Sequence, residues 1–205
     1  MSKTEAPLEA ISRYIPATAA PMILQQLHLY KVHLTITRER KSVLGDYRHA
    51  TAGKSHRISI NGNLNKYSFL ITLIHEIAHL VTFQQHRSRV EPHGKEWKKI
   101  YSLLLNDFLH TSIFPSDLLK ALTGSLHDLP ASSCSDEKLM RVLKKYDPDN
   151  NGLVMVEEIR DGEIFDAGKG KMFRKGKKLR KRYQCVEIAT GRLYLFSPIY
   201  EVKAV

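Results

Sequence analysis

The run from Tyr67 to Gln85 constrains the fold more than any other part of the sequence, because it lacks glycine and proline and predicts one long helix. Its apolar side chains occur on every side of that helix: Phe69, Leu70, Ile71, Leu73, Ile74, Ile77, Ala78, Leu80, Val81 and Phe83. A helix that is apolar all round is buried in a core. The sequence therefore predicts a domain packed around this helix, and a chain of 205 residues can supply that core without disulfides.

Three polar side chains interrupt this buried helix, namely His75, Glu76 and His79. Residues four apart on an α-helix are separated by about 40° around the axis and about 6 Å along it, so both histidines can hold one metal ion. Glu76 lies roughly 100° around, where its carboxylate can accept a proton from a water activated by the metal. The alternative is a polar network that satisfies the three groups within the core. The pattern favours a zinc site, with Glu76 as the catalytic base.

A catalytic zinc site needs a third protein ligand and one open position. His93 is the preferred candidate, because its neighbours Pro92 and Gly94 favour a turn ahead of the helix expected over residues 94–109. Such a turn can fold the imidazole back over the first helix. Two carboxylates remain alternative ligands, Glu91 and Glu96.

A family resemblance rests on His75-Glu76-x-x-His79, on His93-Gly94 ahead of Trp97, and on the upstream segments Leu44-Gly45 and Ile58 to Asn61. Over roughly residues 10 to 110 the chain resembles the SprT-like metallopeptidases, which include bacterial SprT proteins and the Spartan protease. The resemblance implies a minimal zincin-type α+β fold of helices and a small antiparallel sheet. It also implies that His75, His79 and His93 bind Zn²⁺ and that Glu76 is the base. Better-known members act on proteins attached to DNA.

The cysteine content departs from this family. Many bacterial relatives end in a cysteine-rich zinc ribbon, whereas the corresponding tail here holds only Cys185. We therefore expect no second zinc site, and substrate recruitment cannot be copied from those relatives. With Cys134 as the only other cysteine, a disulfide framework is not expected either, and a reducing cytoplasm fits.

Three segments are expected along the chain: a metallopeptidase core at 1–115, a helical connector at 116–146, and a basic, β-rich C-terminal segment at 147–205. In the core, alternating residues predict paired strands at 32–37 and 57–60. The connector is expected to form short helices with a polar joint at 130–133. Further strands are predicted at 153–156, 163–165, 183–188 and 192–196, the last two joined by a hairpin loop at Ala189-Thr190-Gly191.

The positive charge is concentrated in one place. Of a net charge of +11, nine basic residues and no acidic one lie between Lys169 and Arg182. A solvated basic hairpin is one interpretation. We expect instead that the run binds nucleic acid, with single-stranded DNA favoured and RNA an alternative, because Phe173 and Tyr183 could stack on unpaired bases. The expected contact residues are Lys177, Lys178, Arg180, Lys181 and Arg182.

Two further patterns are weaker. The stretch from Asp147 to Glu158 matches a calcium-binding loop, but the residues after it show no helical period, so we predict a turn leading into a strand. His49 and His56 could line the active site, although a surface or core position is more common for a histidine, and Tyr47 could supply a hydrogen bond to the transition state.

The function predicted from these patterns is zinc-dependent hydrolysis of peptide bonds by a metal-activated water, on proteins that include ones bound to nucleic acid. A non-catalytic, zinc-containing nucleic-acid-binding protein is the alternative, but it leaves Glu76 unexplained. A membrane span is not expected, because polar residues interrupt the longest apolar stretch, and the first residues show no export signal. The predicted location is cytoplasmic.

Overall fold

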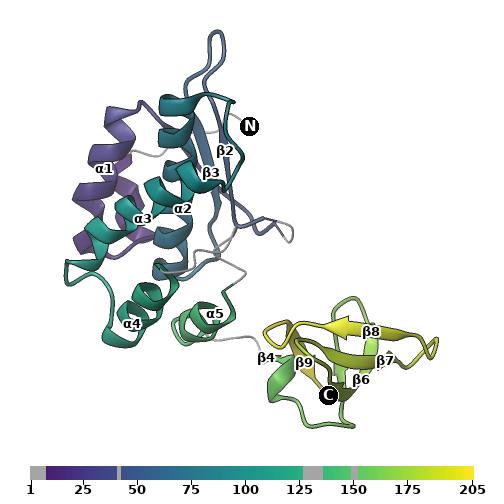
Figure 1. The fold of residues 1–205 in the computed structure, drawn as a ribbon. Helices are drawn as coiled ribbons and strands as arrows, with labels where there is room; N and C mark the ends of the chain where they lie inside the picture. The colour runs from purple at the N-terminus through teal and green to yellow at the C-terminus, as the bar shows by residue number, and fades with distance from the viewer. Residues whose placement is uncertain (1–7, 41–42, 127–135, 149–151) are drawn as a thin grey trace. The chain divides into compact units, whose positions relative to one another are not determined.

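The computed structural model describes residues 8–40, 43–126, 136–148 and 152–205 (Figure 1). The chain divides into two compact units, Met1–Tyr146 and Asp147–Val205. The first combines helices with a three-stranded sheet, and the second is built on a six-stranded sheet. The predicted α+β class is therefore confirmed.

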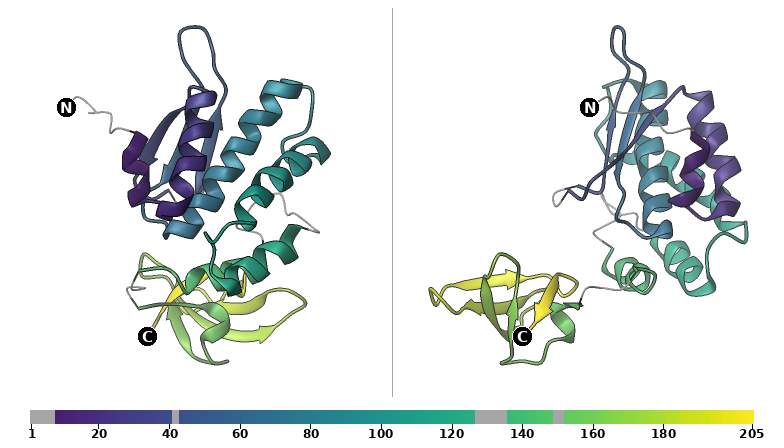
Figure 2. Two further views of the ribbon diagram at one scale, coloured as in Figure 1. Left: turned by 90° about the vertical axis from the view of Figure 1, so that its left-hand side faces the viewer. Right: turned by 180° about the vertical axis from the view of Figure 1, so that it is seen from behind.

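The first unit begins with 3-10 turns at Leu8–Arg13 and Ala17–Ala19. The elements after these turns are α1 (Ala20–Leu29), β1 (His33–Thr37), β2 (Gly45–Arg48), β3 (Arg57–Asn61), α2 (Lys66–His86), α3 (Lys95–Leu109), α4 (Ser116–Ser125) and α5 (Glu137–Lys144). The ribbon views show α1, α2 and α3 on one face of the sheet (Figures 1 and 2). The predicted helices at 67–85 and 94–109 and the short helices of the connector are confirmed, although the joint at 130–133 lies outside the described residues.

The three strands of the first unit lie in the order β1-β3-β2. β3 pairs in parallel with β1 and antiparallel with β2, so the expected small antiparallel sheet is in fact mixed. Ile58 and Ile60 on β3 are fully buried, which agrees with the central position of this strand. β2 was not predicted as a strand, and it forms an edge.

The buried helix α2 starts at a side-chain cap. Oδ1 of Asn65 accepts the backbone N–H groups of Tyr67 and Ser68 at 3.0 and 2.9 Å, which satisfies two donors that the first turn leaves free. The predicted burial is confirmed, because most of the helix has little exposed surface and its apolar residues belong to the main core. α2 packs against β2, β3 and α3, so the polar side chains of its central turn are enclosed.

The second unit has the strand order β4-β9-β5-β6-β7-β8. The strands are β4 (Leu153–Met155), β5 (Ile164–Asp166), β6 (Met172–Lys178), β7 (Tyr183–Glu187), β8 (Leu193–Phe196) and β9 (Glu201–Ala204). Its core consists of Val156, Ile159, Phe165, Phe173, Cys185 and Val202. The four predicted strands and the β7–β8 hairpin are confirmed. β6 and β9 were missed, because cations dominate the first and Val202 is the single large apolar residue within the second.

The segment that resembles a calcium loop is only partly described, since residues 149–151 lie outside the described part of the chain. Strand β4 and a 3-10 turn at Val156–Glu158 complete this segment, and the chain then continues to β5 without the helix that follows the loop of an EF-hand. The carboxylate of Glu158, which would close a calcium loop, accepts the backbone N–H of Met155 at 2.6 Å. The predicted strand after the turn is therefore present.

Among the described residues, no helix has the length and apolar character needed to cross a bilayer. Even α2, the longest, carries His75, Glu76 and His79 at its centre. Cys185 is buried in the core of the second unit, and Cys134 lies outside the described residues.

Candidate metal centre

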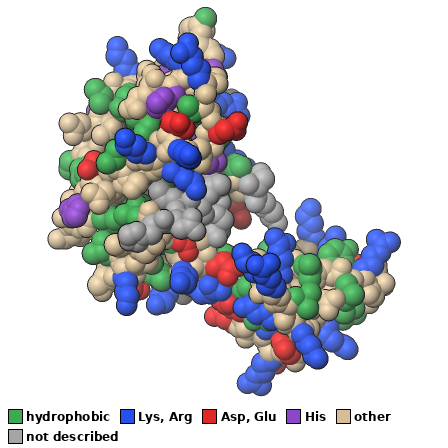
Figure 3. Space-filling view, in the orientation of Figure 1, with side chains coloured by type: hydrophobic (Ala, Val, Ile, Leu, Met, Phe, Trp, Pro, Cys, Tyr) green, Lys and Arg blue, Asp and Glu red, His purple; other side chains and the backbone are tan. Residues whose placement is uncertain are grey.

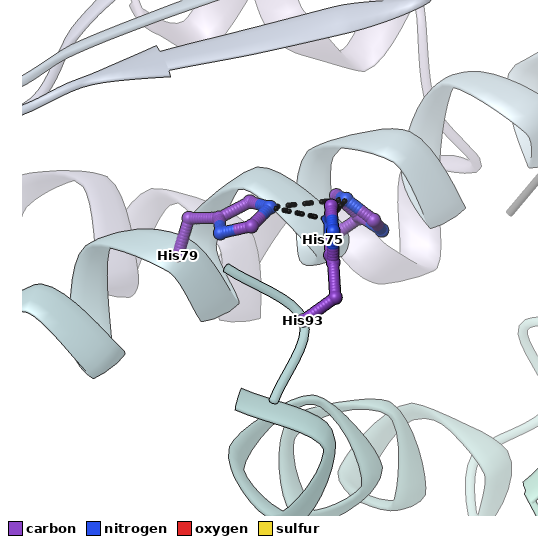
Figure 4. Close-up of side chains that lie close together, drawn as sticks. All are labelled: His75, His79 and His93. Atoms are coloured by element: carbon purple, nitrogen blue, oxygen red, sulfur yellow. Dashed lines mark hydrogen bonds between the residues drawn. The ribbon is translucent and has the colours of Figure 1, made fainter. Parts of the chain in front are cut away.

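Three histidines converge where α2 meets the turn before α3 (Figure 4). His75 and His79 lie one helical turn apart on the same face of α2, as their spacing predicts. His93 reaches them from the turn. The Nε2 atoms are 3.2 Å apart for His75 and His79, 3.0 Å for His79 and His93, and 3.2 Å for His93 and His75.

Hydrogen bonds cannot satisfy this triangle of nitrogens. Each close pair would need one donor and one acceptor, and among three atoms at least one pair must share the same role. A cation removes the conflict, because all three Nε2 lone pairs can then point to one ion. Zinc–nitrogen bonds of about 2.0–2.1 Å in a tetrahedral site hold their nitrogens about 3.3–3.4 Å apart, close to the observed separations. The donor set therefore fits a zinc ion with one position left open.

The turn holds His93 in an uncommon backbone conformation, with φ at 70°. A non-glycine residue in this left-handed region costs of order 1–3 kcal/mol, and such residues concentrate at functional sites. The backbone N–H of Gly94 donates to the carbonyl of Glu91 at 2.9 Å and closes the turn. Among the described residues, the group able to hold a metal consists of the three histidines, without Glu91 or Glu96.

An aromatic wall backs the three imidazoles. The ring of Trp97 lies 4.6, 5.2 and 4.7 Å from the rings of His75, His79 and His93, and its other neighbour is Tyr101 at 4.9 Å. Trp97 is fully buried. Its position fixes the orientation of the imidazoles and excludes water from that side of the site.

The environment keeps the imidazoles neutral, which is the form that binds a metal. Burial, and then the neighbouring His79 and His93, lower the pKa of His75 to about 3. Burial and His93 lower the pKa of His79 to about 4. The pKa of His93 is also lowered, by burial and by the Lys98 ammonium.

Glu76 is buried against the edge of the sheet and is 6% exposed. Its carboxylate lies next to the Cα of Gly45 and accepts the backbone N–H of Tyr47. Burial, and then the Asp46 carboxylate, raise the pKa of Glu76 to about 8, against the opposing effects of Arg40 and the Tyr47 N–H. A bound cation would lower this pKa, so the buried carboxylate would be ionised and ready to accept a proton.

A polar network fixes the chain just ahead of β2. The Arg40 guanidinium donates to Oδ1 of Asn61 at 2.8 Å and to Oγ of Ser59 at 3.0 Å. The amide of the buried Asn61 returns bonds of 3.0 and 3.1 Å to the carbonyls of Arg40 and Val43. The network ties β2 to β3, and thereby holds the strand edge that contacts Glu76.

Tyr47, His49 and His56 form a separate cluster beside the end of α2. The hydroxyl of Tyr47 lies 2.9 Å from Nδ1 of His56, and the amide of Gln84 lies 2.9 Å from Nε2. Burial lowers the pKa of His56, so the ring is neutral and engaged on both nitrogens. The exposed His49 stacks on Phe83. These contacts describe structural roles, and the direct role for Tyr47 at the metal centre remains a prediction.

The expected nucleic-acid-binding residues lie in the second unit, at the end of β6 and in the turn to β7. All five side chains are exposed: Lys177, Lys178, Arg180, Lys181 and Arg182. Lys175 is not part of this surface, because it is buried and its ammonium donates to the carbonyl of Ile159. The expected stacking by Phe173 is wrong, since that ring is in the core. Tyr183 is half-buried, with the Lys175 and Lys178 ammonium groups 4.1 and 5.5 Å from its ring centroid.

Sequence reasoning missed the parts of the site that no motif marks. The close approach of Gly45 to Glu76 had one available signal, a glycine next to residues typical of a strand. Trp97 is a fully buried core residue that also packs against all three histidines, and the sequence gives no sign of this second contact. The role of Arg40 had no signal in the sequence.

The fold and the site together define a class: an α+β domain whose longest helix carries two histidines and receives a third. Comparison with protein families points to the same segment. The model of the SprT-like family matches residues 18–111, and this segment holds the three histidines and Glu76. Comparisons with curated proteins and with solved structures found no match. The class that the fold and the site define is thus an α+β domain with a candidate three-histidine metal centre.

Proposed function

We propose that the protein is a zinc-dependent peptidase in which His75, His79 and His93 hold the metal and Glu76 is the general base. One observation carries this proposal above the others. The three Nε2 atoms meet within 3.2 Å of one another, and the next residue along α2 from the first ligand is a buried carboxylate. A purely structural metal site would need the histidines but gains nothing from a buried carboxylate at that position.

Zinc bound at this centre would polarise the scissile carbonyl and acidify the attacking water. Glu76 accepts the proton of that water and then delivers it to the nitrogen of the departing peptide. The N–H of Tyr47 and the close contact with Gly45 hold the carboxylate in one position while it exchanges the proton. Trp97 keeps the imidazoles oriented and bulk water away from their rear side.

The test separates metal binding from catalysis with three variants. Glu76→Gln is expected to retain about one zinc per chain and to lose cleavage of casein, because an amide cannot accept the proton. His75→Ala is expected to lose the zinc. His28→Ala, which removes an exposed histidine on α1, serves as the matched control and should retain zinc and activity. Full activity of Glu76→Gln would overturn the mechanism, and full zinc occupancy of His75→Ala would move the metal elsewhere.

We further propose that the exposed cations of the β6–β7 turn bring the peptidase to proteins bound to nucleic acid. The support is the charge: the five exposed side chains from Lys177 to Arg182 have no acidic residue among them. Cleavage of a DNA-binding protein should rise when DNA is added, and this increase should disappear when the five are changed to Ser. The preference for single strands and the cytoplasmic location remain predictions.

A zinc-containing protein that binds nucleic acid and cleaves nothing is the competing proposal. It also accounts for the three histidines and for the basic turn. It is favoured if the wild-type protein contains zinc but cleaves neither casein nor a DNA-bound protein, and if Glu76→Gln changes nothing measurable.

A further inference from the structure

The second unit ends its sheet at an exposed apolar strand. β8 is the last strand in the order, and among the described residues it pairs with β7 alone. Leu193, Tyr194 and Leu195 are 61%, 39% and 53% exposed. Natural sheets protect such edges with charged residues, proline or bulges, and β8 contains none of these. An unprotected apolar edge is typical of a strand that receives a partner.

The backbone of β8 offers hydrogen-bonding groups on its free side. The N–H of Glu187 donates to the carbonyl of Arg192 at 2.9 Å. Hydrogen-bonded and non-hydrogen-bonded residue pairs alternate along the hairpin from this bond. Tyr194 therefore turns its backbone groups towards β7, whereas Leu193 and Leu195 turn theirs outwards. Two N–H groups and two carbonyls are thus free to pair with an added strand.

The side chains of these two residues extend an apolar surface on the same face of the sheet. Leu193 lies opposite Val186 and Leu195 opposite Gln184, so both leucines project on the face opposite to the buried Cys185. Ile188, on the same face by alternation, is 46% exposed. Every second side chain of an added strand would therefore lie beside the apolar side chains on this face of the sheet.

Cations flank both ends of β8. The exposed Arg192 precedes the strand, and the exposed Arg182 precedes Tyr183, which pairs with Phe196 at the other end. On the second unit, Figure 3 shows hydrophobic side chains lying among those of Lys and Arg. A second copy of this strand would bring like charges together at its ends, whereas carboxylates there would be attracted.

We propose that β8 binds an extended segment of a partner protein as an additional strand. The segment has two apolar residues spaced two apart, which face Leu193 and Leu195, and acidic residues at both ends. Backbone pairing supplies the affinity, and the apolar pair and the flanking carboxylates supply the specificity.

The experiment measures the binding of labelled peptides to the full chain by fluorescence anisotropy, with Glu76→Gln in every protein so that no peptide is cleaved. The probe is Glu-Glu-Val-Thr-Val-Thr-Glu-Glu, and Glu-Val-Glu-Thr-Thr-Glu-Val-Glu has the same composition without the alternation. Leu195→Pro removes one outward N–H at a position where an edge strand tolerates proline. Leu195→Val retains that N–H and an apolar side chain, and is the matched control.

The probe is expected to bind the Leu195→Val protein within about twofold of the parent, and the Leu195→Pro protein at least about tenfold more weakly. The rearranged peptide should bind at least about tenfold more weakly to the parent. Circular dichroism confirms that each variant is folded. Equal affinity of the two variants, or of the two peptides, overturns the proposal. Self-association of the chain that is detected by sedimentation and abolished by Leu195→Pro also overturns the proposal. The same holds if an oligonucleotide displaces the probe and the rearranged peptide does not.

Discussion

Gly45 brings the edge of the sheet against the face of α2 that carries Glu76. A Cβ atom at this position would lie 2.5 Å from Oε1 of Glu76 and 2.8 Å from Cγ2 of Thr72. Thr72 is buried, and the Glu76 carboxylate is held by the N–H of Tyr47. The absence of a side chain at Gly45 therefore sets the position of the Glu76 carboxylate as directly as the helix does.

We expect Gly45→Ala to retain zinc but to lower the turnover number for casein at least about tenfold, because displacing a reacting group by about 1 Å can cost that much or more. Gly124→Ala is the matched control, since a Cβ there meets nothing within 4 Å. Zinc analysis and steady-state kinetics are the measurements. Wild-type turnover in Gly45→Ala would show that the carboxylate does not need this contact.

The buried Glu76 also predicts how the metal-free protein responds to pH. Burial raises its pKa from the ordinary 4.5 to about 8, so the folded state holds this proton more tightly than the unfolded chain. The stabilisation from the protonated group is complete below pH 4.5 and is lost as the pH rises through 8. Glu76→Gln has no such group, and the histidines titrate alike in both proteins.

In EDTA, the unfolding temperature of Glu76→Gln minus that of the wild type should therefore be at least about 3 °C larger at pH 8 than at pH 5. One pKa unit corresponds to about 1.4 kcal/mol, and about 1 kcal/mol shifts the midpoint of a chain this long by about 2–4 °C. Thermal unfolding followed by circular dichroism is the measurement. A difference that stays constant with pH would mean that Glu76 is not buried in the metal-free state.

The sequence predicts the residues of the candidate site better than the backbone conformations and packing contacts that hold them in place. The spacing of His75 and His79 needs only helix geometry, and Pro92 and Gly94 mark a turn at His93. The left-handed backbone of His93 and the approach of Gly45 to Glu76 depend on tertiary packing. Local patterns carry no information about such contacts.

At the scale of elements, Asn65 joins α2, which carries two of the three histidines, to α5. Its Oδ1 caps α2, and its Nδ2 donates to the carbonyl of Leu143, at the end of α5, at 3.0 Å. The residue is 5% exposed, so these bonds are formed away from water. One buried amide therefore stabilises both the start of α2 and the docking of α5.

Asn65→Ala should lower the free energy of unfolding of the first unit by about 2 kcal/mol, because it removes both the cap of α2 and the side-chain hydrogen bond to the Leu143 carbonyl. Asn65→Ser keeps a capping oxygen and should lose about half as much. Urea unfolding can be followed through Trp97, which is the only tryptophan and is buried in the first unit. Equal losses in both variants would assign the whole effect to the bond with Leu143.

The helices were predictable because the period of their apolar residues can be read from neighbouring positions in the sequence. The strands were less predictable. β3 could be recognised from the alternation of Ile58 and Ile60, whereas β2 has no large apolar residue except Tyr47. β2 becomes a strand by pairing with β3, and that pairing depends on the Arg40–Asn61 network. The mixed pairing of the sheet could not be predicted for a similar reason, since the sequence pattern of one strand does not specify which strands lie beside it.

Across the whole molecule, the family match and the basic charge fall on different units. The match ends at residue 111, whereas the dense cationic run lies in the second unit. The two proposals for that unit also use different parts of it, since β8 offers backbone and apolar side chains, and the β6–β7 turn offers cations. Metal content, peptide binding and nucleic-acid binding should therefore respond to separate substitutions.

Changing Lys177, Lys178, Arg180, Lys181 and Arg182 together to Ser should lower the affinity for nucleic acid and flatten its salt dependence. For every phosphate that the variant no longer neutralises, the slope should fall by about 0.7 with single strands and by about 0.9 with duplex DNA. A control variant removes the same charge from exposed positions of the first unit, Lys54, Arg89, Lys99, Lys120 and Lys138. Fluorescence anisotropy with labelled oligonucleotides at several salt concentrations measures both proteins, and zinc content should stay unchanged in each. Equal slopes for the two variants would assign the cations of the turn to solubility, or to a different anionic partner.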